Sequence, residues 1–338
     1  MKNIYDQFLY KNLNLTITNE DFETNNILRV CFQLGNICTY DCSYCSDGNK
    51  NGTHEWPEFS IVENLVLEID RIYKAAPYNK KEIIFEYLGG EVTLWKDFEK
   101  LLILVYELGN KSWLVTNGVR TLRWWKEYGK YFDLITLSAH LEFCDIEHLC
   151  DVGNILSNNN VLTSITVLMY PPKWNECLAA IKYLKENSKC SCFTKTLVKT
   201  TDDTSFGDEW EYTNKELDYI KKNFLIIRGS SRISDFFLWR NSKTREIQTR
   251  DSEVGLTFRE NNFYNWKCYA GIDTLYLENN GDVRVGAMCR PVPPLGNWKK
   301  DDVSTIKWPF EPVICKYLQC ICGHDLRARK FKTNDNNI

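Results

Sequence analysis

Between residues 28 and 198, short apolar runs typical of buried strands alternate with segments whose apolar residues recur at helical spacing. Strands are predicted at 28–32, 83–88, 113–115, 134–137, 165–168 and 193–198, and helices at 61–73, 98–108, 123–128, 146–156 and 174–186. Buried strands that alternate with helices form a parallel sheet, because each helix carries the chain back to the same edge. The pattern predicts an α/β fold, a partial (β/α)6 barrel of the TIM type, with its chemistry at the carboxyl ends of the strands.

Composition limits the partners and the compartment. The net charge of −3 gives no pull toward nucleic acid or an anionic membrane surface. No apolar run approaches the ~18 residues of a membrane span, and the first residues are too polar for a signal peptide. We therefore expect a cytoplasmic protein without nucleic-acid or membrane partners. In that compartment the 14 cysteines favour metal binding or catalysis over disulfides.

Three of these cysteines, Cys38, Cys42 and Cys45, directly follow the first predicted strand. Three thiolates can hold a four-iron cubane by three corners and leave the fourth iron free for a ligand. The sequence thus predicts an iron-sulfur site at the carboxyl end of the first strand.

Other polar motifs fall at the ends of the next strands. The second strand ends in Gly89-Gly90-Glu91, where the glycines let a ligand approach the backbone and the carboxylate suits a cationic amine. The third ends in Thr116-Asn117-Gly118 and the fourth in Ser138-Ala139-His140. Each is an ordinary turn sequence when taken alone, but together they would lie around one rim.

With these motifs, roughly residues 28 to 200 resemble the radical S-adenosylmethionine (radical SAM) enzymes. The resemblance rests on the spacing of Cys38, Cys42 and Cys45, on Tyr44 before the last cysteine, and on 89–91 at a strand end. It implies a [4Fe-4S] cluster whose open iron binds S-adenosylmethionine. Reductive cleavage would give a 5′-deoxyadenosyl radical that abstracts hydrogen from a substrate. An electron donor such as a flavodoxin or ferredoxin is then expected.

The resemblance also implies roles for single residues. The methionine amine would meet Gly89, Gly90 and Glu91, the backbone at Tyr44 would meet the adenine, and Thr116 and Ser138 would approach the ribose or carboxylate. The sequence departs from the family pattern at Val92, where proline is common, and at His140, where an acidic residue is frequent. We expect His140 to be either a hydrogen-bonding or proton-transfer group of the barrel mouth, or a packing residue.

A second cysteine cluster follows in the last quarter of the chain. Leu275–Leu277 and Val283–Val285, joined by a turn at 279–282, indicate a hairpin that would bring Cys268 and Cys289 together. Cys315, Cys320 and Cys322 complete the set. The segment resembles the twitch and SPASM extensions of radical SAM enzymes, a small domain of β-hairpin plus helix that holds auxiliary clusters. Five cysteines imply the twitch form, with one auxiliary [4Fe-4S] cluster.

The ligand set of that auxiliary cluster is open at one place. Cys268, Cys289 and Cys320 are the firmest candidates, and Cys315 and Cys322 compete for the fourth position. A structural zinc site is the alternative, because four thiolates also suit tetrahedral zinc. The scattered Cys144, Cys150, Cys177, Cys190 and Cys192 are expected to be buried core residues.

The expected organisation has five parts. They are an N-terminal extension (1–27), the barrel (28–225), a linking segment (226–262) that follows an expected loop at 201–210, the auxiliary-cluster domain (263–330) and a disordered tail (331–338). The basic run Arg327–Lys332 is expected to be a solvated end.

The substrate is not encoded in any of these motifs. One hypothesis is a dehydrogenase or epimerase acting on a small sugar or cyclitol, an oxidoreductase in which the auxiliary cluster takes up an electron or a thiol returns a hydrogen. Cys144, or whichever of Cys315 and Cys322 is unligated, would be the thiol. The alternatives are an enzyme that crosslinks or epimerises a peptide, and a non-catalytic metal-binding protein.

Overall fold

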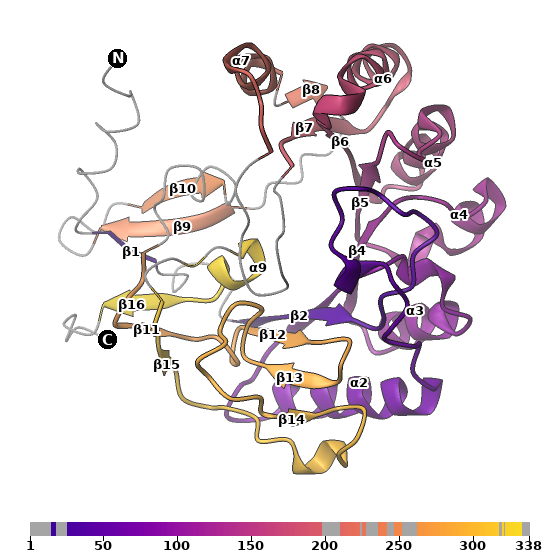
Figure 1. The fold of residues 1–338 in the computed structure, drawn as a ribbon. Coiled ribbons are helices and arrows are strands. Elements are labelled where there is room, and N and C mark those ends of the chain that lie inside the picture. Colours follow the sequence, from indigo (N-terminus) through magenta and orange to yellow (C-terminus); the bar gives the residue numbers. More distant parts are fainter. Residues whose placement is uncertain are drawn as a thin grey trace. The chain divides into compact units, whose positions relative to one another are not determined.

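The computed structural model describes residues 15–17, 26–197, 210–223, 225–227, 236–241, 247–251, 262–317, 320 and 322–332. Its chain divides into two compact units (Figure 1). The first, here the cysteine-rich unit, comprises Met1–Cys31, Glu63–Ile84 and Ser234–Ile338. The second, here the barrel unit, comprises Phe32–Val62 and Phe85–Ile233.

Strands in chain order form the sheet of the barrel unit. The order is β2 (Ile27–Gln33), β3 (Glu82–Leu88), β4 (Lys111–Thr116), β5 (Leu134–Ala139), β6 (Leu162–Leu168), β7 (Ser191–Lys195) and β8 (Leu225–Ile227). The ladders from β4 to β7 are parallel, and β8 closes the edge antiparallel to β7. The division between the units passes through β2 and β3, whose carboxyl ends belong to the barrel unit. The predicted parallel α/β fold is confirmed.

Helices follow the strands as the apolar periodicity predicts. They are α2 (Phe59–Lys74), α3 (Phe98–Glu107), α4 (Leu122–Tyr128), α5 (Ile146–Asn158), α6 (Trp174–Asn187) and α7 (Asn214–Lys222), with the 3-10 turns η2 (Asp47–Asn49), η3 (Val92–Leu94), η4 (Gly129–Tyr131) and η5 (Pro171–Lys173). Side chains cap several amino ends: the Asp145 carboxylate accepts from two backbone N–H groups of α5, and Thr213 forms a capping box at α7. Figure 1 shows α3 to α6 along one face of the sheet.

The two faces of this sheet differ in burial. On the face toward the helices, alternate residues such as Leu137 and Val167 are buried. The other face is less uniformly buried, although Ser164 and Ser191 are buried there. Toward the carboxyl ends of the strands its half-buried or exposed residues are Trp113, Val115, Thr136, Ser138, Thr166, Leu168, Phe193 and Lys195. We call this set the inner face. It has hydroxyl groups at the centre of the sheet, where Ser138 lies beside Thr166 in the ladder.

The cysteine-rich unit contains two antiparallel ladders and most of α2. One has the order β10 (Ile247–Asp251), β9 (Phe236–Asn241), β1 (Leu15–Ile17), β16 (Lys330–Lys332), β11 (Trp266–Cys268) and β15 (Val313–Ile314). The other joins β12 (Thr274–Leu277), β13 (Asp282–Arg284) and β14 (Gly296–Asn297). The unit also contains the 3-10 turn η6 (Val303–Thr305) and the short helix α9 (Gly323–Leu326).

A buried ion network ties together parts of this unit that are far apart in sequence. The Lys80 ammonium lies 2.8 Å from Oδ1 of Asp273, and Nε of Arg329 lies 2.8 Å from Oδ2 of the same carboxylate. The Asp273 carboxylate is therefore paired with both cations, and a buried charge is stable only when it is paired in this way.

Two expectations are corrected at the carboxyl end of the described chain. Phe331 and Lys332, expected in a disordered tail, lie in β16, which pairs with β1 and β11. The basic run 327–332 is not a solvated end, because Ala328 and Lys330 are buried. Segment 226–262 contains β9 and β10. Strands β16 and β9 pair with partners remote in sequence, which local patterns do not reveal.

Other expectations lie partly outside the described residues, namely the loop at 201–209 and the segments 1–14, 18–25 and 333–338. Among the described residues, no helix has both the length and the apolar character to cross a membrane.

Candidate functional site

The three cysteines of the first motif lie together in the loop that follows β2. Burial raises the pKa of each thiol, to about 12 for Cys42, and the field of Cys45 and then of Cys38 raises that of Cys42 further. Such thiols stay protonated until a cation takes the place of the proton. The donor set therefore fits a metal cluster.

No single-ion site is evident: within the described ranges, no three His, Cys, Asp or Glu side chains converge closely enough to hold one metal ion. A cubane is bound through one iron per thiol, so its ligands surround the cluster instead of meeting at one point.

Asn36, which is fully buried, organises the chain on both sides of the cysteines. Its Nδ2 donates to the Gly48 carbonyl at 2.9 Å and to Oδ1 of Asn51 at 2.8 Å. Its Oδ1 accepts from the His54 backbone N–H at 2.8 Å. One side chain thus closes the loop that contains the three cysteines. The sequence analysis did not find this residue, because its partners lie 12 to 18 positions away.

Lys50 fixes the middle of the same loop. Its ammonium donates to the Cys42 carbonyl at 2.9 Å and lies 2.6 Å from Oδ1 of Asp41.

The glycines at the end of β3 dock against the start of the loop. Gly90 has φ +54°, and a Cβ there would collide with the Ile37 carbonyl and lie 2.9 Å from the carbonyl carbon of Asn36. The next backbone N–H, that of Glu91, donates to the same Ile37 carbonyl at 2.8 Å. Glycine is therefore required here by the close approach of two backbones.

Glu91 joins the ends of two strands. Its buried carboxylate accepts from Oγ1 of Thr93 at 2.6 Å, from Oγ1 of Thr116 at 2.8 Å and from the Asn117 N–H at 2.8 Å. Burial raises the Glu91 pKa, whereas these hydrogen bonds, first that of Thr93, lower it. The predicted contact with a methionine amine stays a prediction. Thr116, predicted to approach a ribose or carboxylate, is one of the donors to Glu91.

Asn117 connects this network to the cysteines. Its Nδ2 donates to Sγ of Cys38 at 3.9 Å, and its Oδ1 accepts from the Val119 N–H at 3.0 Å. Hydrogen bonds to ligating sulfurs tune iron-sulfur clusters. The sequence analysis placed Asn117 at a strand end but assigned it no role.

Aromatic and polar residues after β5 and β6 hold the cysteine loop from the other side. His140 Nδ1 lies 2.9 Å from the Tyr44 hydroxyl, and the two rings stack with centroids 5.8 Å apart. The Ser43 hydroxyl lies 2.7 Å from that of Tyr170, and its N–H donates to Glu142 at 2.8 Å. The structure therefore places His140 against the cysteine loop, where it forms a hydrogen bond with Tyr44. Its role in proton transfer stays a prediction.

Burial lowers the His140 pKa to about 4, so the imidazole is neutral at pH 7. The half-buried Cys144 follows it, and burial raises its pKa to about 12, with smaller contributions from Asp145 and Cys42. Its thiol keeps its proton at neutral pH. Ser138, predicted to approach a ribose or carboxylate, lies on the inner face directly beside Thr166 of the neighbouring strand.

The cysteines of the second cluster come from separate segments of the cysteine-rich unit. Cys268 lies in β11, outside the β12–β13 hairpin, but Cys289 packs against the cluster of apolar residues to which Cys268 belongs. Cys315 and Cys320 pack against Phe263 and Leu326. The expected meeting of Cys268 and Cys289 thus depends on packing between segments and not on the ends of one hairpin.

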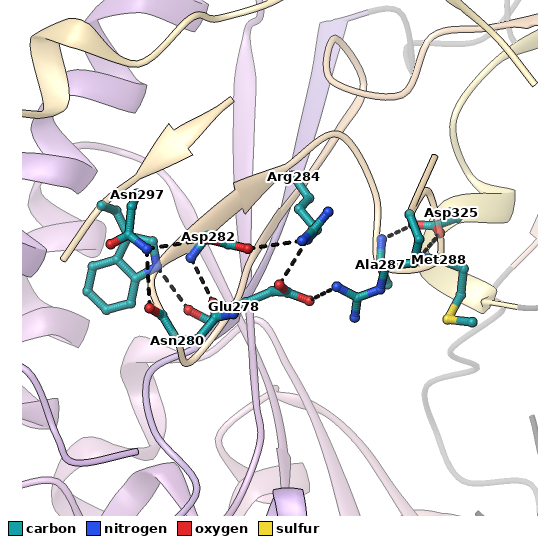
Figure 2. Close-up of polar contacts among 10 residues, drawn as sticks. Glu278, Asn280, Asp282, Arg284, Ala287, Met288, Asn297 and Asp325 are labelled. Atoms are coloured by element: carbon teal, nitrogen blue, oxygen red, sulfur yellow. Dashed lines mark hydrogen bonds and ion pairs between the residues drawn. The ribbon is translucent and has the colours of Figure 1, made fainter. Parts of the chain in front are cut away.

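Asp325 of α9 positions the loop before Cys289. Its two carboxylate oxygens accept from the Ala287 and Met288 N–H groups, each at 2.8 Å (Figure 2). A Cβ at Gly286 would lie 2.7 Å from the Asp325 carboxylate and 3.1 Å from Sγ of Cys289.

An ion network around the buried Glu278 fixes the neighbouring hairpin. Glu278 pairs with Nε of Arg284 at 2.9 Å (Figure 2). It also pairs with Nη1 of Arg290, the residue after Cys289, at 2.5 Å. The backbone on both sides of Cys289 is thus anchored by carboxylates.

The cysteines of this unit lie close enough to raise one another's pKa. Burial raises the pKa of Cys268, Cys289 and Cys320, and that of Cys322 to about 12. Cys268 raises the pKa of both Cys289 and Cys320, and Cys315 in turn raises that of Cys268. The chemistry of this thiol-rich donor set suits an iron-sulfur cluster. The alternative, zinc, needs its ligands to converge on one point, and within the described ranges no three such side chains do so. Cys315 and Cys322 both stay candidates for the fourth ligand.

Comparison with known proteins places these features in a family. A family model described as the radical SAM superfamily matches residues 32–208, more than half of the chain. A curated S-adenosylmethionine-dependent nucleotide dehydratase from Lacinutrix mariniflava is 26% identical over 172 residues, a match that covers 45% of this chain and 35% of the relative.

Solved structures show a similar fold. SuiB from Streptococcus suis bound to S-adenosylmethionine has a TM-score of 0.52 and 15% identity, and the match covers 85% of this chain and 66% of SuiB. Native anSMEcpe with bound AdoMet has a TM-score of 0.51 and 15% identity, covering 83% of this chain and 80% of that protein. The chain therefore spans about a third of the dehydratase and 66% of SuiB.

Proposed function

Since the chain belongs to the radical SAM superfamily, we propose that Cys38, Cys42 and Cys45 bind a [4Fe-4S] cluster at which S-adenosylmethionine is cleaved reductively. When bound, these groups supply a 5′-deoxyadenosyl radical that abstracts a hydrogen atom from the substrate. The substrate we propose is a small hydroxylated molecule such as a sugar or cyclitol, which is dehydrogenated or epimerised. An auxiliary [4Fe-4S] cluster in the cysteine-rich unit is part of the proposal.

One observation carries the cluster site. The three cysteines lie in a loop that is closed by Asn36 and docked on Gly90, and Asn117 reaches the sulfur of Cys38 from the end of β4. Two side chains, Asn36 and Asn117, and the backbone at Gly90 thus hold the loop at the ends of three strands, as a preorganised site requires.

The proposed cofactor contacts follow the same rim. Glu91 orders the ends of β3 and β4 through its hydrogen bonds, so the surfaces offered to S-adenosylmethionine are held in place. The contacts we propose are Gly89, Gly90 and Glu91 with the methionine amine, the backbone at Tyr44 with the adenine, and Thr116 and Ser138 with the ribose or carboxylate.

The inner face supports a hydroxylated substrate. Thr136, Ser138 and Thr166 present hydroxyl groups on partly exposed positions of adjacent strands, and Lys195 is exposed on the same face. Hydroxyls both donate and accept hydrogen bonds, which suits recognition of a polyol. The name of the dehydratase relative points in the same direction, since removal of water from a nucleotide starts from a hydroxyl group.

In a dehydrogenation, the substrate carbon would lose a hydrogen atom to the deoxyadenosyl group, and its hydroxyl would lose a proton to a base. Neutral His140 is the candidate base. The carbonyl product forms when one further electron is removed. The auxiliary cluster, which the thiols of the cysteine-rich unit would hold, would supply a one-electron acceptor.

In an epimerisation, the Cys144 thiol would return a hydrogen atom to the opposite face of the carbon. Its raised pKa keeps the required S–H bond intact at neutral pH. Return of Cys144 to the thiol requires one electron and one proton. The auxiliary cluster, held by the thiols of the cysteine-rich unit, would supply a one-electron donor.

The test is transfer of deuterium from polyols and sugars labelled at their carbinol carbons into 5′-deoxyadenosine, followed by mass spectrometry. We expect a one-mass-unit gain with at least one such compound. Cys144→Ala should abolish turnover of an epimerase and spare a dehydrogenase. Label transfer only from peptides would overturn the proposed substrate class and leave the superfamily chemistry intact.

A further inference from the structure

Lys330 is an ammonium buried in the cysteine-rich unit, with 1% of the residue exposed. Its three N–H groups donate to the carbonyls of Asp325 at 2.6 Å, Ala328 at 2.9 Å and Leu326 at 3.4 Å. Its Nζ also lies 5.1 Å from the centroid of the Phe263 ring. These acceptors are neutral, so they solvate the positive charge without cancelling it. The Asp325 carboxylate is near, and its two oxygens accept from the Ala287 and Met288 N–H groups. Buried lysines are rare unless a counter-charge is near.

Thiols from separate segments surround this ammonium. Cys268 is the direct cross-strand partner of Lys330 in the β11–β16 ladder, so their side chains share one face of the sheet. Cys320 packs against Phe263, the ring beneath the ammonium. Cys289 packs against the cluster that contains Cys268. The three firmest candidate ligands of the auxiliary cluster thus lie around one fixed positive charge.

We propose that the Lys330 ammonium is the counter-charge of the auxiliary cluster and raises its reduction potential. This inference rests on the proposed auxiliary cluster. A cluster held by thiolates is net negative and gains a further negative charge when it takes up an electron. A fixed positive charge in a low-dielectric surrounding stabilises the reduced form more than the oxidised form. It also offsets the nearby Asp325 carboxylate, which is held at the loop before Cys289.

A purely structural role is the alternative, because the three hydrogen bonds fasten the carboxyl end of α9. A fastening role predicts a change in stability but no change in the potential of a cluster that still binds. The two roles therefore differ in a spectroscopic measurement.

The experiment uses the full chain with Cys38, Cys42 and Cys45 replaced by Ala, so that only the auxiliary cluster contributes. In this parent, Lys330→Met removes the charge at similar length, and Lys330→Arg retains it. Lys299→Met is the matched control, since Lys299 is a half-buried lysine of the same unit whose Nζ donates to the Asn279 carbonyl at 2.7 Å. Midpoint potentials are measured anaerobically by redox titration followed by electron paramagnetic resonance.

We expect a lower potential in Lys330→Met and nearly the parent's potential in Lys330→Arg and Lys299→Met. A folded Lys330→Met that loses the cluster, while Lys330→Arg retains it, supports the charge role equally. Two outcomes overturn the role of Lys330 and leave the proposed auxiliary cluster standing. One is an unchanged potential in Lys330→Met, and the other is loss of the cluster from both Lys330 variants. A folded parent that binds no iron overturns the auxiliary cluster itself, and with it this inference.

Discussion

Glu91 shows at the residue scale how a predicted ligand also organises the site. Its carboxylate accepts from Thr93, Thr116 and Asn117, and neither oxygen lacks a donor. Glu91→Gln replaces one acceptor by an amide that faces existing donors. We expect the free energy of unfolding to fall by about 1–3 kcal/mol, measured by chemical denaturation.

Glu107→Gln, at an exposed position of α3, is the control and should unfold like the wild type. If Glu91→Gln is as stable as the wild type, Glu91 does not tie the strand ends together.

His140 predicts a pH dependence of stability. Its pKa is about 4 in the folded chain against an ordinary value of 6.5, so between these values only the unfolded chain binds the proton. Above pH 6.5 both states are neutral and the contribution is constant. As the pH falls from 6.5 to 4, the free energy of unfolding should decrease, by at most about 3 kcal/mol and by less where solvent reaches the ring.

Denaturation at pH 7 and pH 5 checks this expectation. His140→Gln should lose less stability over that interval than the wild type does. His54→Gln is the control, because the His54 backbone N–H, and not its side chain, donates the hydrogen bond to Asn36. Equal losses in His140→Gln and the wild type would show that His140 is not the source.

Single residues were predictable where the chemistry lies in local sequence. The spacing of Cys38, Cys42 and Cys45 is visible without any structure. Asn36 and Lys330 were not recognised, because their partners come from distant segments and a buried lysine in a basic run looks like an exposed one. Burial is a property of the assembled unit.

At the scale of elements, the junction between β3 and the cysteine loop depends on glycine. In Gly90→Ala, both the positive φ and the contact with the Ile37 carbonyl should lower the free energy of unfolding. In Gly109→Ala, only the positive φ should lower it, because a Cβ there meets nothing within 4 Å. We expect about 1 kcal/mol at Gly109 and about 1–3 kcal/mol more at Gly90.

Thermal or chemical denaturation measures the difference in stability between the two variants. The iron content is measured separately after reconstitution. Gly90→Ala should also bind less iron at the first site. Equal destabilisation of the two variants would contradict the close approach of the two backbones.

Helix α9 and the loop before Cys289 form a second junction. Asp325→Asn leaves one oxygen for two N–H donors, Ala287 and Met288, so one of them is orphaned. In the chain that lacks the first three cysteines, we expect a lower iron content than in the parent. Asp302→Asn keeps one oxygen for its single donor, the Ser304 N–H at the start of η6, and should bind as much iron as the parent. Undiminished iron in Asp325→Asn would show that this carboxylate does not position Cys289.

The elements themselves were largely predictable where apolar periodicity is local. The predicted strands and helices from 28 to 187 match β2 to β6 and α2 to α6 closely. The ladder of β1, β9, β16 and β11 was not predicted, because its strands are short and their partners are remote. The same limit explains why Cys268 was assigned to the outer end of a hairpin.

At the scale of the whole molecule, the two cysteine sets fall in different units, Cys38 to Cys45 in one and Cys268 to Cys322 in the other. The sites should therefore fill independently. We expect about eight iron atoms per reconstituted chain, and about four after either set is replaced by Ala. Loss of all iron on replacement of one set would contradict two separate sites.

The central claim is that this chain cleaves S-adenosylmethionine at the cluster of Cys38, Cys42 and Cys45. The most direct test is the formation of 5′-deoxyadenosine by anaerobically reconstituted protein with dithionite and S-adenosylmethionine. The wild type should form it, and the variant with these three cysteines replaced by Ala should form none while retaining the wild-type circular dichroism spectrum. A wild-type protein that holds its iron yet forms no 5′-deoxyadenosine, or a triple variant that still forms it, would contradict the claim.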